Sequence, residues 1–326
     1  MGEAVWVIGA GGLLGSAVVR AIQRRGGMAL HAVDEDLAWG NNALLAAQLD
    51  REVAAFARAT ERGGRWLLVW AAGVSSMSSD AASLELESRA LDLLLERLMA
   101  DPVLRATQGC LVLASSAGAI YGQSREDHIG ESSPLAPGTP YATHKLLQEA
   151  KLRRAVLAQP GWTVMLARFS TLYGPGQSRD KAQGLITQLA RRIVGNQVVH
   201  IYVPLDTIRD YIFVDDAADR TLDAARDLRN RAGEVVVKII AAEQATSIAQ
   251  LVGVFRRVSR RPVRLVTSVN SLSPLYVRCI RFRSDEPIGH PHAACCSLHI
   301  GIHKVLEAER IAAFRGEAAF GANASR

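Results

Sequence analysis

The sequence predicts an α/β protein with a doubly wound parallel sheet, followed by a smaller C-terminal α/β domain. Three observations support this fold class. Short apolar runs alternate with helical patterns through the first half of the 326-residue chain. Those runs are apolar throughout, which is typical of parallel strands covered by helices on both faces. The length of the chain also suits a main domain with a smaller second domain.

The predicted elements of the first half alternate between strand and helix. Strands are expected at 4–10, 29–35, 66–73, 109–117 and 162–170, and helices at 13–26, 84–100 and 141–158. The pattern is less regular after residue 177. Helices are expected there at 182–195, 247–261 and 298–311, strands at 198–203 and 233–241, and a strand followed by a helix within 209–228.

This pattern predicts two domains. The first spans 1–175, and the chain returns to it within 207–241. The second consists of 176–206 and 242–326, and we expect it to bind the substrate.

Composition narrows the classes of partner. The net charge is +6 and the sequence pI is near 9.4. The arginines are spread along the sequence, and the densest groups are pairs such as 24–25, 191–192 and 260–261. Solvated helix faces explain such pairs better than a nucleic-acid surface does, so no nucleic-acid partner is expected. A basic balance also suits an anionic small substrate such as a phosphate ester.

The cysteines and the hydropathy indicate a cytoplasmic protein. Cys110, Cys279, Cys295 and Cys296 show no disulfide framework, which favours a reducing compartment. No run of about 18 apolar residues is present, so no membrane partner is expected.

A group of histidines and cysteines near the C-terminus invites comparison with a zinc site. It consists of His290, His292, Cys295, Cys296, His299 and His303. Adjacent cysteines suit a single metal ion poorly, and the paired ligand spacing of zinc sites is missing. We therefore expect no metal.

A glycine-rich turn follows the first predicted strand and opens a helix. Gly9, Gly12 and Gly15 stand at G-x-x-G-x-x-G spacing. Such glycines allow a tight turn, a close approach of backbone N–H groups to a pyrophosphate, and close packing of helix on strand. The N–H groups expected at the cofactor include those of Leu13 and Leu14.

This context predicts a Rossmann domain that binds a dinucleotide, although a plain tight turn is the alternative. Asp34 ends the second predicted strand and is placed to accept hydrogen bonds from the adenosine ribose. An acid at that position repels a 2′-phosphate, so NAD is favoured over NADP.

Tyr141 and Lys145 form the predicted catalytic pair. Residues four apart share a helix face, and an ammonium beside a phenol favours the phenolate. The ammonium and a cationic nicotinamide are therefore expected to move the pKa of Tyr141 toward neutrality, so that it can exchange a proton with a sugar hydroxyl. Both residues are also expected at the cofactor, where the lysine ammonium can reach the nicotinamide ribose hydroxyls. The chain holds six tyrosines and five lysines, so about 0.1 such pairs are expected by chance. Two surface side chains are the alternative.

Ser115 and Ser116 stand where the fourth predicted strand ends. Ligands bind at the carboxyl ends of the strands in open α/β sheets, so at least one serine is expected to polarise the reacting oxygen. Ordinary turn chemistry is the alternative.

Together these motifs resemble the extended short-chain dehydrogenase/reductase superfamily, and within it the NAD-dependent epimerase/dehydratase family typified by UDP-galactose 4-epimerase. The resemblance covers residues 4 to about 255. It rests on "GAGGLLG", "WAAG" (70–73), "SSAGAIYG" (115–122), the tyrosine–lysine pair, "ARFSTLYGPGQ" (167–177) and "RDYIFVDDAA" (209–218). It implies that Ala71 and Ala72, within "WAAG", line the cofactor site.

The resemblance also implies substrate contacts. Arg209 matches an arginine that contacts nucleotide phosphates in this family, and Arg281 or Arg283 is the candidate for a second one. Surface salt bridges are the alternative for all three arginines. Thr171 stands where the family usually has a substrate-contacting asparagine.

Two departures from the family pattern bear on the activity. The family's catalytic hydroxyl often lies five residues before the glycine of "YG", where this chain has Ala117. Ser116 lies one residue earlier. Family members that dehydrate sugars resemble one another in a Thr-Asp-Glu run, where this chain has Ala117 and Gly118. A dehydratase is therefore disfavoured.

The sequence thus predicts an NAD-dependent nucleotide-sugar 4-epimerase that acts through a transient 4-keto intermediate. A 4-ketoreductase or dehydrogenase with the same residues is the alternative, and a non-catalytic NAD(P) sensor is disfavoured because tyrosine and lysine are both present. The resemblance also implies a homodimer formed through helices 84–100 and 141–158.

Overall fold

The computed structural model describes residues 2–33, 35–73, 80–177, 184–267, 278–289 and 295–323. Its centre is a six-stranded, wholly parallel sheet in the order β2-β1-β3-β4-β5-β9. The strands are β1 (Glu3–Ile8), β2 (Met28–His31), β3 (Arg65–Trp70), β4 (Gln108–Ser116), β5 (Trp162–Phe169) and β9 (Val235–Ile240). This sheet confirms the predicted doubly wound α/β class.

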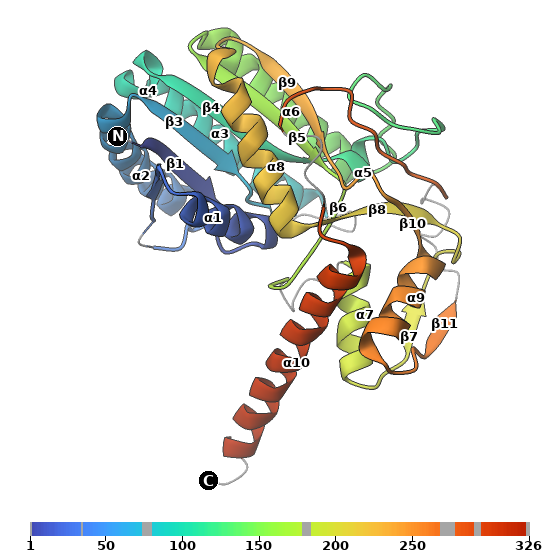
Figure 1. Ribbon diagram of the computed structural model, residues 1–326. Helices are drawn as coiled ribbons and strands as arrows, with labels where there is room; N and C mark the ends of the chain where they lie inside the picture. Colours follow the sequence, from blue (N-terminus) through green and yellow to red (C-terminus); the bar gives the residue numbers. More distant parts are fainter. Residues whose placement is uncertain are drawn as a thin grey trace.

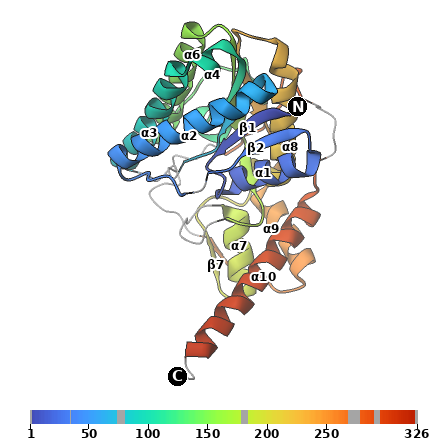
Figure 2. The same cartoon turned by 90° about the vertical axis from the view of Figure 1, so that its left-hand side faces the viewer.

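Helices cover both faces of the sheet (Figures 1 and 2). One face packs on α1 (Leu13–Arg25) and α8 (Val214–Asp227), and the other on α2 (Asn42–Gly63), α3 (Ala81–Ala100) and α6 (Pro140–Ala158). Burial on both faces explains why the strands are rich in apolar residues: all eight residues of β5 are buried, and only Thr163 and Arg168 among them are polar. The short helices α4 (Pro102–Ala106) and α5 (Ala117–Ile120) and the 3₁₀ turn η1 (Leu228–Asn230) complete this part.

Local sequence signals define the start of the helix that carries the predicted catalytic pair. The Thr139 hydroxyl accepts a hydrogen bond from the Ala142 N–H, and Pro140 occupies the first turn. Both features are typical of a helix N-terminus. In α3, the side chain of Asp80 plays the same role for the Ser83 N–H.

Aromatic side chains fill the core on the α2/α3/α6 face. The rings of Trp66 and Trp162 meet edge to face with centroids 5.1 Å apart. Both indoles donate to the Leu104 carbonyl, at 3.4 and 2.9 Å. These two indole N–H groups are therefore hydrogen-bonded although their rings are buried in the core.

The remaining elements form a smaller lobe below the sheet (Figure 1). They include a three-stranded sheet, β6 (Thr171–Tyr173), β8 (Ile208–Phe213) and β10 (Ala245–Ser247), and a pair, β7 (Val199–Ile201) and β11 (Leu265–Thr267). Around them lie α7 (Leu185–Val194), α9 (Ile248–Ser259) and α10 (Leu298–Asn323). Between its two segments in this lobe, the chain runs back through α8 and β9.

Helices α2, α4, α5 and α10 differ from the sequence-based predictions, and the short helices α4 and α5 were not predicted. Helix α2 was not predicted, although Leu45, Leu49, Val53 and Phe56 recur at three- and four-residue intervals and are buried. Helix α10 extends to Asn323, beyond the predicted end at 311, and its distal half projects away from the body (Figures 1 and 2). None of the helices in the described ranges is long and apolar enough to span a membrane.

Candidate active site

The glycine-rich turn lies at the switch point of the sheet. Strand β1 has β2 on one side and β3 on the other. The chain passes from β1 to β2 and then crosses back over β1 to β3, so successive crossovers run in opposite directions. This arrangement opens a crevice at the carboxyl end of β1, where open α/β sheets bind ligands. The turn from β1 into α1 forms the floor of that crevice.

Close backbone contacts explain the glycines at 9 and 15. Gly9 has φ +88°, and a Cβ there would lie 2.6 Å from the Ala72 nitrogen. A Cβ on Gly15 would lie 2.1 Å from the Gly9 carbonyl oxygen. The Ala71 N–H donates to the Ile8 carbonyl at 2.9 Å, which fixes the end of β3 beside the turn. The sequence thus brings the predicted cofactor residues of β1 and β3 together.

The start of α1 fits a pyrophosphate. Gly12 is the N-cap residue and has no side chain to bond the first helical N–H groups, and the first turn contains no acid. Leu13 and Leu14 begin the helix, where N–H groups lack an intrahelical acceptor and the helix dipole favours an anion. Asp34 lies outside the described residues.

Tyr141 and Lys145 lie on one face of α6, as predicted. The Lys145 Nζ is 5.7 Å from the centre of the Tyr141 ring. Lys145 is buried and Tyr141 is half-buried. The pair therefore sits at the edge of the protein interior and not on an exposed surface.

Glu87 is a member of this site that was not predicted from the sequence. Its Oε1 accepts a hydrogen bond from the Lys145 Nζ at 2.8 Å and another from the Gln148 Nε2 at 3.0 Å. Lys145 also donates to the Gln148 Oε1 at 3.0 Å. Glu87 belongs to α3, 58 residues before Lys145, so no local spacing connects the two.

The electrostatics of Tyr141 differ from the sequence-based prediction. Burial raises the pKa of Tyr141, Lys145 lowers it by a smaller amount, and Glu87 raises it further. Burial is the largest of these effects, so the pKa of Tyr141 is raised in the protein alone. The predicted shift toward neutrality includes the cationic nicotinamide and stays a prediction. Burial tends to lower the pKa of Lys145, but Tyr141 and Glu87 outweigh this effect, so that pKa is raised.

The two serines at the end of β4 point in different directions, as neighbours on a strand do. The Ser115 hydroxyl is buried and donates to the Glu149 Oε1 at 2.7 Å. The Ser116 hydroxyl accepts from the Ala119 N–H at 3.3 Å and caps α5. Ser115 is thus fixed in an internal polar cluster, whereas Ser116 is half-buried at the strand end. The next residue, Ala117, is fully buried.

The predicted substrate residues lie around β8. Arg209 is on β8, and Thr171 begins the neighbouring strand β6, where it pairs with Tyr211. The segment that carries Arg281 runs beside β8, since Cys279 pairs with Ile208.

Arg281 is half-buried and Arg283 is exposed. Arg281 therefore follows directly on the residues that pair with β8, the strand that carries Arg209. Arg283 lies two residues further along the chain and is exposed.

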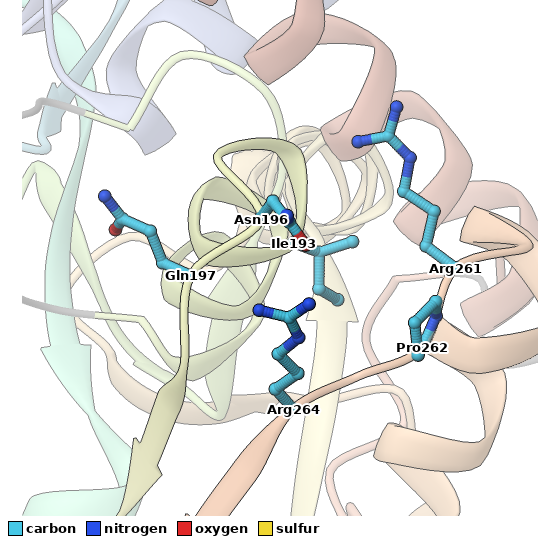
Figure 3. A pocket seen from close by; sticks show the side chains of 6 residues that line it. All are labelled: Ile193, Asn196, Gln197, Arg261, Pro262 and Arg264. Carbon is cyan, nitrogen blue, oxygen red and sulfur yellow. The ribbon is translucent and has the colours of Figure 1, made fainter.

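One pocket lies apart from these residues. It has a volume of about 330 Å³ and is lined by Ile193, Asn196, Gln197, Arg261, Pro262 and Arg264, from the end of α7 and the connection between α9 and β11 (Figure 3). Among the described residues no group of three acidic, histidine or cysteine side chains could hold a metal ion. His290 and His292 lie outside the described residues.

Comparison with known proteins identifies the class of this molecule. The glycine turn at the switch point and the tyrosine–lysine helix define a dinucleotide-binding α/β enzyme. The model of the NAD dependent epimerase/dehydratase family matches residues 5–239. The chain therefore belongs to that family, which confirms the resemblance stated from the motifs and NAD as the cofactor of the family.

Individual relatives differ in activity. The chain is 33% identical over 110 residues to dTDP-4-dehydro-6-deoxyglucose reductase of Escherichia coli, covering 33% of this chain and 34% of that protein. It is 28% identical over 180 residues to UDP-glucose 4-epimerase 4 of Oryza sativa subsp. japonica, covering 49% and 48%. These alignments therefore span half or less of the curated relatives' length.

A solved structure confirms the fold over almost the whole chain. UDP-glucose 4-epimerase of Thermotoga maritima, solved with UDP-glucose, superposes with a TM-score of 0.72 at 19% identity. The superposition covers 95% of this chain and 99% of that one. At this identity the likeness shows the fold alone.

Proposed function

We propose that this enzyme is a nucleotide-sugar 4-epimerase that uses NAD and a transient 4-keto sugar. The observation that carries the proposal is the placement of Tyr141 and Lys145 on one face of α6, at the carboxyl edge of the sheet that carries the glycine turn. The likeness to UDP-glucose 4-epimerases supports the choice of substrate class and reaction.

Each group of residues has a defined task. The start of α1 and the backbone of Gly9, Ala71 and Ala72 would hold NAD, which supplies a reversible hydride acceptor when bound. Tyr141 removes the proton of the sugar 4-hydroxyl and returns it after the keto sugar has turned its other face. Lys145 stabilises the phenolate form of Tyr141. We assign the polarisation of the sugar oxygen to Ser116, because Ser115 is held by Glu149.

The nucleotide end of the substrate is assigned to the small lobe. Arg209 and Arg281 are proposed to pair with the diphosphate, since guanidinium groups bind phosphate oxygens in a bidentate manner. Thr171 is proposed to contact the sugar. Arg283 is exposed and is the weaker candidate for a phosphate contact.

A one-way 4-ketoreductase is the second candidate, and the likeness to the E. coli reductase favours it. The two activities differ in their use of cofactor. An epimerase converts UDP-glucose to UDP-galactose without added cofactor, because the hydride returns to the sugar. A reductase consumes added NADH or NADPH in proportion to product. Turnover that depends on added reduced cofactor would therefore contradict the epimerase.

Two lysines of α6 provide a matched test of the site. Lys145 and Lys151 each pair with one acid of α3, Glu87 and Asp92 respectively, at 2.8 and 2.6 Å. Lys145→Met and Tyr141→Phe are expected to reduce kcat at least a hundredfold, in the usual range for acid–base groups. Lys151→Met should retain activity. Tyr141→Phe should still bind NAD, and an unchanged function of this variant in cells would support a non-catalytic cofactor sensor instead.

We also propose a homodimer through α3 and α6. Leu86 on α3 and Leu147 on α6 are 42% and 55% exposed, which leaves apolar side chains on these helices available to a second copy. Light scattering of the double variant Leu86→Ser/Leu147→Ser tests this proposal: the wild type should have the mass of a dimer and the variant that of a monomer. A monomeric wild type would contradict it.

Cytoplasmic location and the domain division are likewise proposals. All four cysteines are free, which supports a reducing compartment. The Rossmann domain is assigned to 1–175 with the return within 207–241, and substrate binding to 176–206 and 242–326. Limited proteolysis with and without UDP-glucose would test the division, since substrate should protect the second part.

A further inference from the structure

We propose that Glu87 is a positioning residue that holds the Lys145 ammonium in a closed buried network and offsets its charge at Tyr141. This inference rests on the proposed role of Tyr141. It concerns a residue on α3 that no sequence motif singles out.

The network is a closed ring of three side chains. Lys145 donates to Glu87 and to Gln148, and Gln148 donates to the same Glu87 oxygen, with all three distances between 2.8 and 3.0 Å. The Lys145 and Glu87 side chains are only 6% and 4% exposed. Gln148 is fully buried, and its Nε2 lies 3.1 Å from the His144 Nε2. Lys145 therefore has little freedom to change its position.

The Glu87 carboxylate also lies close to Gly73, three residues beyond the end of β3. A Cβ on Gly73 would lie 3.2 Å from both carboxylate oxygens. Gly73 follows Ala71 and Ala72, the residues packed against the glycine turn. Glu87 is thus wedged between the strand end at the cofactor crevice and the helix that carries Tyr141.

The charge of Glu87, and not only its hydrogen bonds, matters for Tyr141. A glutamine could accept the same bond from Lys145, so the carboxylate differs from it chiefly in charge. The other charged or titratable groups near the pair are His144, Glu149 and Lys151. The electrostatic effects resolved on the pKa of Tyr141 come from Lys145, which lowers it, and from Glu87, which raises it. Glu87 therefore favours the protonated tyrosine.

The test is a titration of Tyr141 in Glu87→Gln, followed by the ultraviolet absorbance of tyrosinate. The titration of the same protein carrying Tyr141→Phe is subtracted as the background of the other tyrosines, so that the difference reports Tyr141 alone. The midpoint is expected to fall by about one pH unit, which is a tenfold rise in the tyrosinate fraction at a given pH. The pH dependence of kcat should shift in the same direction.

Asp92→Asn is the matched control, because Asp92 also lies on α3 and pairs with a lysine of α6. Its Tyr141 titration should match the wild type. A midpoint in Glu87→Gln that also matches the wild type would overturn the proposal. If Glu87→Gln does not fold, Glu87→Asp keeps the charge and should keep the wild-type midpoint, and a lower midpoint would contradict the role of charge. The titration needs no turnover, so an error in the assigned reaction would not affect it.

A separate observation concerns the charge of the small lobe. Segments 184–205 and 247–267 contain seven arginines and no aspartate or glutamate. The two segments therefore carry a formal charge of +7. The whole chain has a net charge of +6, so the rest of the chain carries a net charge of −1. The arginines are Arg191, Arg192, Arg256, Arg257, Arg260, Arg261 and Arg264. The fold thus brings these positive charges together in one lobe, although the arginine pairs are spread along the sequence.

Two of these arginines line the pocket of Figure 3. Arg191, Arg192, Arg256 and Arg257 lie in the last turns of α7 and α9, where the helix dipole accounts for them. Arg261 and Arg264 lie beyond α9. The Arg261 guanidinium donates to the Val194 carbonyl at the end of α7 at 3.5 Å, so a helix C-terminus also accounts in part for Arg261. In Figure 3 the Arg264 side chain extends toward Ile193 and Asn196. Guanidinium groups, amides and an apolar floor in about 330 Å³ suit a compact anion with an apolar part.

We infer that this pocket binds a phosphorylated small molecule, away from the proposed catalytic site. Calorimetry with pyrophosphate as the probe, on protein saturated with NAD and UDP, should show a site that Arg261→Ser/Arg264→Ser weakens at least tenfold. The control Arg256→Ser/Arg257→Ser should bind as the wild type does. Equal binding by both double variants, or no binding by the wild type, would overturn the inference.

Discussion

Replacing Glu149 by leucine is expected to destabilise the protein by about 3–5 kcal/mol, the usual effect of leaving one charge of a buried ion pair without its partner. Glu149 on α6 and Arg168 on β5 are each 3% exposed. Arg168 donates from Nε to the Glu149 Oε1 at 2.9 Å and from a terminal nitrogen to Oε2 at 2.6 Å. It also contacts the Tyr121 hydroxyl. Without Glu149, the guanidinium keeps its charge and loses the carboxylate that pairs with it.

Urea denaturation followed by circular dichroism measures this effect. A loss of 3–5 kcal/mol corresponds to a fall in Tm of about 6–20 °C for a domain of this size. The double variant Glu149→Leu/Arg168→Met removes both charges and should recover most of the loss, since apolar replacement of a whole buried pair is often neutral. A single variant that loses less than about 1 kcal/mol, or a double variant less stable than the single one, would refute the reasoning.

Three further predictions follow from close contacts and burial. Gly15→Ala should abolish NAD binding in calorimetry, because the added Cβ would lie 2.1 Å from a carbonyl oxygen of the glycine turn. A Cβ on Gly11 meets nothing within 4 Å, so the control Gly11→Ala should bind NAD as the wild type does. Gly109→Ala would place a Cβ 2.0 Å from an indole ring of the core and should cost about 1–3 kcal/mol on unfolding, while Gly253→Ala, in open space on α9, should stabilise slightly. Burial raises the pKa of Cys110 to about 12, so this thiol should stay protonated and resist a disulfide reagent at neutral pH until denaturant is added. Rapid labelling of Cys110 in the native protein would contradict the last prediction.

The placements in the fold that agree with the sequence-based expectations depend on short spacings. The glycine turn is defined by residues within seven positions, and Tyr141 and Lys145 by a single helical turn. Apolar runs bounded by glycine located the main strands to within a few residues. Such patterns work because backbone conformation and side-chain direction are fixed locally.

The features that were missed join distant parts of the chain. Glu87 meets Lys145 only because α3 and α6 pack together on one face of the sheet. Ser115 and Ser116 are adjacent in sequence, yet Glu149 takes one of them into an internal cluster, which no spacing reveals. The burial that raises the pKa of Tyr141 in the protein alone could not be read from a spacing for a related reason, since burial is a property of the folded chain.

The sheet order also sets the order in which the protein can be completed during synthesis. Strand β5 ends at Phe169, but its outer neighbour β9 ends at Ile240, after much of the small lobe has been made. At about 5–20 residues per second, β5, whose residues are all buried in the finished fold, waits about 4–14 s for its partner. During that interval a nascent chain presents an open strand edge of the kind that invites pairing with other chains. We expect this intermediate to be the stage at which the growing protein depends most on chaperones.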